Sequence, residues 1–148
     1  LESLDLDLAR ETYQTAWGAA ALSEDLAARD VLLDICRAVQ ALPSLQGPPR
    51  PLDLLLDGLA LLITEGHAVA APTLQRAVVA VADIPVEDVL RWGWMAVGAH
   101  SAVWDYEGWY ATATRQIEVI RDAGALAELP IHLTYLSMVV MWIKGRLK

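Results

Sequence analysis

Several residue types that carry common chemistry are scarce in this chain of 148 residues. It has one cysteine, Cys36, and no phenylalanine. A single thiol excludes an internal disulfide, which is the usual situation in a reducing compartment, so we expect a cytoplasmic protein. Cys36 follows the apolar positions Leu32 and Leu33 and precedes Val39 on one helical stripe, which predicts a buried structural thiol.

Positive charge is also in short supply. Eleven Lys and Arg residues stand against nineteen Asp and Glu residues, giving a formal net charge of -8. Proteins bind nucleic-acid phosphates through clustered basic residues, so this balance argues against direct nucleic-acid binding. The chain contains no G-x-x-x-x-G-K-[ST] phosphate loop, and we expect no bound cofactor.

Targeting and membrane-spanning segments are not expected either. The first residues are acidic and lack the basic start of a signal peptide. The chain begins at Leu1 and not at a methionine, which is the pattern of a processed product or of a fragment. The most apolar stretch, residues 131–143, is short for a membrane span and predicts a buried helix. The alternative is a helix that docks on a membrane or partner, with Lys144 and its basic neighbours at the rim.

What the chain does have is apolar residues at helical spacing. They make up 55% of the sequence. Residues 52–81 are the clearest case, since their apolar side chains recur at i, i+3, i+4 and i+7 on either side of the helix-ending Gly66. Asp53 and Asp57 are assigned to the exposed face of the first of these two helices. No segment predicts a convincing strand.

Two such helices cannot bury their apolar faces alone, so further hairpins must stack on them. We therefore predict an all-α fold of about seven helices, arranged as antiparallel hairpins in a right-handed array. Residues 1–148 are expected to form one domain. Residues 1–42 are its N-terminal hairpin, residues 43–51 a proline-rich extended connector, and residues 52–148 the helical array.

Three helices have predicted inner faces. One helix runs from about Leu6 to Leu22, another over residues 86–102 and a third from Tyr106 to about Asp122. The second is apolar nearly all round and is expected in the middle of the array. The first should bury Ala9, Tyr13, Ala16, Trp17 and Ala20, and the third should bury Tyr106, Tyr110, Ala113, Ile117 and Ile120.

Aromatic residues concentrate in the second half of the chain. Trp92 and Trp94 are about 200° apart on a helix, so they cannot face the same way. Packing between helices explains most of these rings, because Trp fills large gaps. The alternative is an aromatic-lined groove for a peptide or a small apolar ligand. Its predicted residues are Trp94, His100, Trp104, Tyr106 and Trp109.

No pattern predicts an enzyme or a metal site. None of His67, His100 and His132 has a second His, Cys or carboxylate at position i+3 or i+4. Ser101 lies beside His100, but adjacent residues of a helix do not face one another. His100 is expected to be a core or groove histidine, with ligand contact as the alternative. Catalytic residues and metal ligands are therefore predicted to be absent.

Four phrases of the sequence resemble one known family. LARETY, PPRPLDLLLDGLALLITEGHAVAAPTLQRAV, LRWGWMA and WDYEGWYATATRQIEVIRDAGALAELPIHL are similar to the middle region of the large actinobacterial LuxR-type regulators. The resemblance covers about residues 8–135. In that family an ATP-binding module precedes a long tetratricopeptide-like helical region, and a helix-turn-helix follows it.

The resemblance implies a non-catalytic part of a transcription regulator. It predicts a tetratricopeptide-like interaction or sensor segment that binds a protein partner or an effector, while ATP hydrolysis and DNA binding belong elsewhere. A small-molecule-binding helical domain with an aromatic-lined pocket is the alternative. The apparent internal repeat of roughly 40 residues is longer than the ~34 of a tetratricopeptide unit.

The last helix has more apolar residues than one helix face holds. They occupy consecutive positions as well as positions three and four apart, so some are expected to remain exposed. Exposed apolar patches usually mark contacts, and two-fold dimers are the commonest closed assemblies. We therefore expect a homodimer that associates through Val139, Trp142 and Ile143.

Overall fold

The computed structural model describes residues 2–23, 25, 27–45 and 47–146 of the chain. Within this part there are eight α-helices and three short 3-10 helices and no strand, which confirms the all-α prediction. The α-helices are α1 (Glu2–Ala21), α2 (Ala27–Gln40), α3 (Pro51–Thr64), α4 (His67–Ala80), α5 (Val86–Trp92), α6 (Ala96–Ala102), α7 (Tyr106–Asp122) and α8 (Leu129–Arg146). The 3-10 helices are η1 (Val81–Asp83), η2 (Gly93–Met95) and η3 (Leu126–Glu128).

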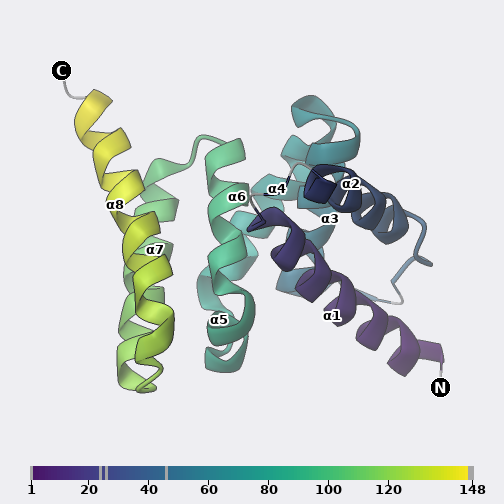
Figure 1. The fold of residues 1–148 in the computed structure, drawn as a ribbon, viewed down its shortest axis with the longest axis horizontal. Helices are drawn as coiled ribbons and strands as arrows, with labels where there is room; N and C mark the ends of the chain where they lie inside the picture. The colour runs from purple at the N-terminus through teal and green to yellow at the C-terminus, as the bar shows by residue number, and fades with distance from the viewer. Residues whose placement is uncertain (1, 24, 26, 46, 147–148) are drawn as a thin grey trace.

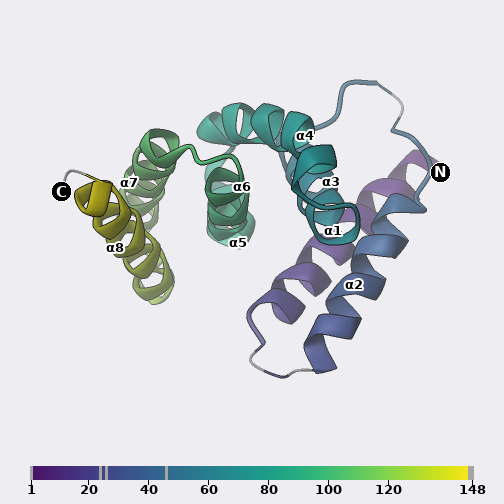
Figure 2. The same ribbon diagram turned by 90° about the horizontal axis from the view of Figure 1, so that it is seen from above.

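The helices follow one another as packed neighbours. Helices α1 and α2 form one end of the molecule and α7 and α8 the other, so the two termini lie far apart (Figure 1). Seen from above, α4 reaches from α3 toward α6 and joins the two halves (Figure 2). The segments α5, η2 and α6 form one interrupted helical run, which leaves seven helical units as predicted.

Helix α1 buries a different face from the one predicted. Trp17 is buried as expected, but its buried companions are Arg10, Gln14 and Gly18, not the predicted small residues and Tyr13. These four positions follow i, i+4, i+7 and i+8 spacing, which also defines one helix face. The polar ones are buried because this face meets the start of α3, where Gln14 Nε2 donates to the Leu52 carbonyl oxygen at 3.2 Å.

The assignment of Asp53 to an exposed face is wrong. Its side chain is 1% exposed and accepts from Arg10 Nε at 2.7 Å and from Arg50 Nε at 2.8 Å. Arg10 also bonds Asp57 Oδ1 at 2.5 Å. Asp53 belongs to the first turn of α3 and accepts from the Arg50 backbone N–H at 3.2 Å as well. We call these four residues, Arg10, Arg50, Asp53 and Asp57, the charge network.

The main core lies between α2 and α6. Leu55, Leu56, Leu59 and Leu74 are buried at its centre, and Cys36 is buried as predicted. Burial raises the pKa of the Cys36 thiol. Helices α3 and α4 approach closely at Gly58, where an added Cβ would lie 2.6 Å from Leu74 Cδ2. A glycine is needed there because the space for a side chain is already filled.

The predicted continuous helix over residues 86–102 is interrupted at η2. Gln116 of α7 donates from Nε2 to the Gly93 carbonyl oxygen at 2.8 Å. Its side chain reaches that carbonyl because Gly93 has no Cβ, and an added one would lie 3.0 Å from Nε2. Trp92 is buried, while Trp94 points the other way onto Trp17 of α1, with ring centroids 6.3 Å apart.

The two C-terminal helices depart from prediction in one respect each. On α7, Tyr106, Ala113, Ile117 and Ile120 are buried as predicted, but Tyr110 is exposed and Trp109 is buried in its place. On α8, only 11% of the apolar stretch Leu126–Gly145 is buried, so the predicted buried helix is wrong. This helix lies at the end of the array, and its main neighbour is α7 (Figure 1). The stretch Leu126–Gly145, 20 residues, is long and apolar enough to cross a membrane by length and composition.

The residues predicted to join two copies of the chain differ in burial. Val139 is 0% exposed and packs in the cluster of Tyr106, Trp109 and Ala113, so the prediction that it lies at a contact between copies is wrong. Ile143 is half-buried against the same cluster. Trp142 stacks on Tyr106, with ring centroids 6.1 Å apart, yet more than half of it remains exposed.

Replacing Asp53 is expected to unfold the protein far more readily than replacing an exposed aspartate. Asp53→Asn leaves Arg10 without the buried one of its two carboxylates, and breaking a buried ion pair costs about 3–5 kcal/mol. Asp34→Asn is the matched control, since Asp34 pairs with Arg37 at the surface, where a pair contributes about 0.2–1 kcal/mol. Urea unfolding followed by circular dichroism measures both variants. Equal losses of stability would contradict a structural role for the charge network.

Candidate functional site

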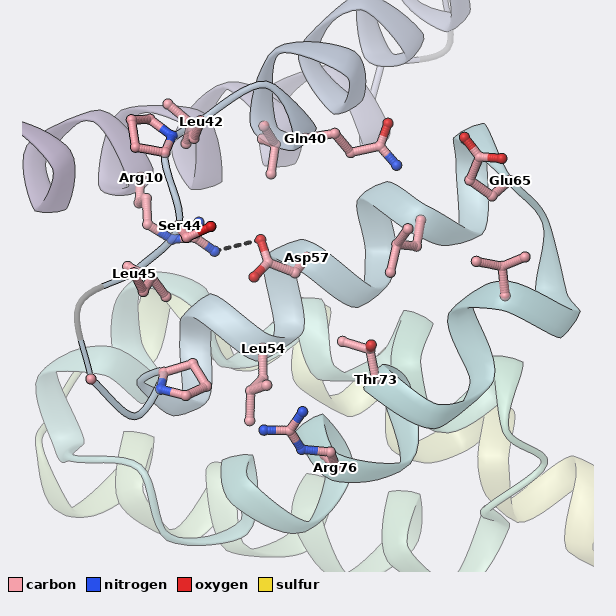
Figure 3. Close-up of a pocket in the computed structure, with 16 residues that line it drawn as sticks. Arg10, Gln40, Leu42, Ser44, Leu45, Leu54, Asp57, Glu65, Thr73 and Arg76 are labelled. Atoms are coloured by element: carbon pink, nitrogen blue, oxygen red, sulfur yellow. Dashed lines mark hydrogen bonds and ion pairs between the residues drawn. The ribbon is translucent and has the colours of Figure 1, made fainter.

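Four segments of the chain together form a large groove. The end of α2, the connector over residues 41–50, α3 and α4 enclose a volume of about 810 Å³. Figure 3 shows the groove with α3 across its middle and the connector along one side. Aliphatic side chains from all four segments line it, namely Val39, Leu42, Leu45, Leu54, Leu61 and Val69. We call it the connector groove.

Two residues of the charge network, Arg10 and Asp57, line the connector groove. Arg10 reaches it from α1 and meets Asp57 of α3 there (Figure 3). Burial by itself would lower the pKa of Arg10, but its hydrogen bonds to Asp57 and Asp53 raise it above the ordinary value. Arg10 is therefore a fixed positive charge beneath the groove, and it is largely neutralised by the two carboxylates.

The two carboxylates that share Arg10 are not equivalent. Burial opposes ionisation of Asp53, yet the hydrogen bonds from Arg50 and Arg10 hold its pKa below the ordinary value. Burial raises the pKa of Asp57, because Arg10 only partly offsets the loss of water and Asp53 repels a second negative charge. Asp53 is thus held in its ionised form between two arginines, whereas Asp57 bonds Arg10 alone and is the more exposed of the two carboxylates.

Further charged groups lie along the walls. Asp57 and Glu65 are eight residues apart on α3, so about 12 Å separates them at 1.5 Å per residue. Arg76 comes from α4 on the facing wall, and Thr73 adds a hydroxyl one turn earlier (Figure 3). The connector groove therefore combines aliphatic walls with two carboxylates and two guanidinium groups, and no aromatic residue lines it.

The predicted aromatic groove is not assembled as one site. Trp94 of η2 packs against Trp17 of α1, while Trp104, Tyr106 and Trp109 cluster at the start of α7. Tyr106 and Trp109 are buried and stack with ring centroids 6.5 Å apart, so they are packing residues. Trp104 is exposed, with φ at +59° in the turn before α7. None of these four rings lines the connector groove.

His100, the remaining predicted groove residue, is buried between helices. Its Nδ1–H donates to Asp105 Oδ2 at 3.1 Å, since an ionised carboxylate only accepts. Asp105 Oδ1 in turn accepts from the Gly108 backbone N–H at 2.9 Å and caps α7. His100 thus fastens the cap of α7 to α6, and this role is that of a core histidine.

The other two histidines also have packing roles. His132 of α8 is buried and donates from Nδ1 to Gln116 Oε1 at 3.1 Å. His67 is exposed at the start of α4, and its Nε2 meets the Ala102 carbonyl oxygen at 2.5 Å. Among the described residues no group of three His, Cys, Asp or Glu side chains is placed to hold a metal ion.

Reasoning from the sequence missed the connector groove. Arg10 interrupts the apolar face of α1, and a charged residue in that position signals a buried partner. Asp53 and Asp57, spaced i and i+4, were available as that partner. Nothing in the sequence, however, indicates that α1 crosses α3, which is what brings the three residues together.

Comparison with known proteins adds no relative. No protein-family model, no curated protein and no solved structure matches this chain.

Mild acid is expected to destabilise the fold through its buried histidines. Burial lowers the pKa of both His100 and His132 from 6.5. Their neutral forms are therefore favoured in the folded state. The unfolded chain takes up these protons as the pH falls through about 6.5, while the folded chain does not. The two histidines therefore do not lower the free energy of unfolding above about pH 6.5. Below that pH the free energy of unfolding declines by up to about 1.4 kcal/mol per pH unit for each histidine.

Urea unfolding between about pH 7.5 and 5 measures this decline. In His132→Gln, the glutamine amide keeps a donor for Gln116 but does not titrate, so the slope should fall to about half. An unchanged slope would show that His132 is not buried in its neutral form.

Proposed function

We propose that the chain is a non-catalytic helical scaffold that binds an extended segment of a partner protein in the connector groove. The observation that carries the proposal is a large open hollow with aliphatic walls and charged groups spaced along it. Its volume of about 810 Å³ is within the range of ligand sites. Small-molecule sites are usually more enclosed and rich in aromatic walls, and this groove has neither property.

The charges favour a particular kind of segment. Asp57 Oδ1 bonds Arg10, and the side chain is still 37% exposed, so its second oxygen can accept from a further cation. A basic side chain of the partner would supply that cation, with Glu65 two turns further along α3. Aliphatic neighbours of the basic residue would fill the space beside Leu54 and Leu61. We therefore infer a segment with a Lys or Arg between aliphatic residues.

The resemblance to LuxR-type regulators supports the same function. In that family the helical middle region separates an ATP-binding module from a DNA-binding module, so an interaction or sensor role fits a segment without either. We propose that this chain is such a segment of a cytoplasmic transcription regulator. Neither the partner nor the effector follows from the resemblance.

A synthetic peptide with one arginine between leucines, blocked at both ends, tests the proposal. In ¹H–¹⁵N spectra of the labelled protein, it should shift backbone signals of Gln40, Ser44, Asp57 and Thr73. Asp57→Asn should weaken binding about tenfold, since a hydrogen bond to a charged group contributes about 1.5–3 kcal/mol. Asp83→Asn is the control, because Asp83 is exposed in η1 and outside the groove.

A peptide with glutamate in place of arginine should bind the unmodified protein weakly. Its affinity should be no higher than that of the arginine peptide for the Asp57→Asn variant. Equal binding of the two peptides to the unmodified protein would contradict the assignment of Asp57. Absence of any shift in the groove up to millimolar peptide would overturn the proposed function itself.

A second candidate function rests on a smaller hollow beside Trp94. It encloses about 380 Å³ between α1 and the α5–η2 segment, and Trp92 and Trp94 line it. Gly18 leaves room for the Trp94 ring, since an added Cβ would lie 2.8 Å from Cζ2. The Arg91 guanidinium lies 4.6 Å from the Trp92 ring centroid at the same place. We infer that a small planar anion would be the matching ligand.

Indole-3-acetate and uncharged indole are suitable probes for this second candidate. Indole-3-acetate at millimolar concentration should shift the Trp94 indole N–H signal more than indole does. In the Arg91→Gln variant the two probes should cause equal shifts. Equal shifts by the two probes in the unmodified protein would show that Arg91 selects no anion. Shifts confined to other tryptophans would remove the candidate.

A further inference from the structure

Helix α4 contributes two hydrogen-bond donors to the connector groove. Thr73 and Arg76 both line the groove, and they are neighbours on one face of the helix because three positions separate them (Figure 3). Neither side chain forms a hydrogen bond or an ion pair with another described residue. A hydroxyl and a guanidinium are therefore both free to bind a molecule that enters the groove.

The hydroxyl of Thr73 differs in this respect from other hydroxyls on the helices. Five threonines donate from Oγ1 to the carbonyl oxygen four residues earlier at 2.8–3.0 Å, namely Thr12, Thr15, Thr64, Thr114 and Thr134. Thr73 makes no such bond within the described chain. Its hydroxyl proton is therefore not already used inside α4.

The two donors lie level with Asp57 on the facing helix. Helices α3 and α4 form an antiparallel hairpin and meet closely at Gly58, where an added Cβ would lie 2.6 Å from Leu74 Cδ2. Asp57 is next to Gly58 in sequence, and Thr73 and Arg76 are on either side of Leu74. A carboxylate and two donors therefore border the same stretch of the groove.

The opposite charges of Arg76 and Asp57 are not paired with each other. The Asp57 carboxylate bonds Arg10, and no ion pair joins it to Arg76 in the described part of the chain. Figure 3 shows the Leu54 side chain between the two charged groups. A bound segment satisfies both groups only if it presents a positive charge to Asp57 and a negative charge to Arg76.

A carboxylate is the acceptor that matches Thr73 and Arg76 together. A guanidinium can donate two parallel N–H bonds to a carboxylate, and a hydroxyl can donate one more. Successive side chains of an extended chain point to opposite sides. An acidic residue directly beside the basic residue of the segment would therefore point toward α4 while the basic residue points toward Asp57.

We propose that Thr73 and Arg76 bind the side-chain carboxylate of an Asp or Glu that stands directly beside the basic residue of the bound segment. This inference rests on the proposed binding of an extended segment in the connector groove, and it makes that segment bipolar. The net charge of the chain is -8, so an added acidic residue would weaken binding to most of its surface. Tighter binding of an acidic peptide is therefore specific evidence for this site.

Three blocked peptides test the assignment. The first is the peptide with one arginine between leucines. In the other two, glutamate replaces the leucine directly before or directly after the arginine, which allows for either direction of the segment in the groove. In titrations followed by ¹H–¹⁵N spectra, at least one glutamate peptide should bind about tenfold more tightly than the arginine peptide, because it gains a charge-assisted hydrogen bond.

Variants of α4 should remove this gain and then restore it. In Arg76→Gln, the arginine peptide and the better glutamate peptide should bind with affinities within about twofold of each other. In Arg76→Glu, a peptide with lysine in place of the glutamate should recover the lost affinity to within about threefold. Thr73→Val should reduce the gain about threefold, since it removes one hydrogen bond.

Arg121→Gln is the matched control for the loss of one positive charge. Arg121 is exposed on α7 and lies outside the groove, so the tenfold preference for the glutamate peptide should persist in this variant. Helical circular dichroism of each variant checks that it is folded. Arg76 is itself exposed, so its replacement removes no buried contact.

The possible failures separate this inference from the proposed function. If the arginine peptide shifts the groove signals but neither glutamate peptide binds more tightly, the groove function stands and the carboxylate site is overturned. If the gain persists in Arg76→Gln, the carboxylate binds elsewhere and the assignment is wrong. If none of the three peptides shifts the groove signals, the groove function fails and this inference fails with it.

Discussion

The contact between Arg10 and Asp53 determines how the N-terminal half is assembled. It joins α1 to the first turn of α3 across 43 positions of sequence, and both side chains are buried. Taking two charges out of water is costly, and the geometry compensates through hydrogen bonds from both arginines to Asp53. Next to this contact, the connector leads from the end of α2 to the start of α3. The connector groove is the space that this path leaves.

A neutral chain of hydrogen bonds has the corresponding role in the C-terminal half. His132 donates to Gln116, and Gln116 donates to the Gly93 carbonyl oxygen. These hydrogen bonds link α8 to α7 and α7 to η2. The interruption at η2 turns Trp94 toward α1 and leaves Trp92 in the core. The two halves are therefore held by different interactions. Buried charges that also border the connector groove hold the N-terminal half, and hydrogen bonds between neutral groups hold the C-terminal half.

The sequence predicted the helices well and their faces less well. The all-α class, the connector and the turn at Gly66 follow from local signals, namely apolar spacing, proline and glycine. On α1 the buried face was assigned one residue away from the true one, because small residues were preferred over Arg10 and Gln14. On α7 only Tyr110 was wrong, since Trp109 is buried in its place. Burial of α8 was predicted from its apolar composition, but most of the helix is not buried. Composition gives the amount of apolar surface, but only neighbouring helices determine how much of it is covered.

By itself, the sequence determined a helical, acidic chain with one proline-rich interruption and an excess of apolar surface at its end. Each of these properties is local or additive, so spacing and composition are sufficient to read it. Tertiary structure alone decided that Arg10, Asp53 and Asp57 meet, that Trp94 and Trp109 separate, and that α8 has an uncovered face. Those outcomes depend on how helices cross. Crossing is decided by contacts between residues far apart in sequence, and no local pattern records them.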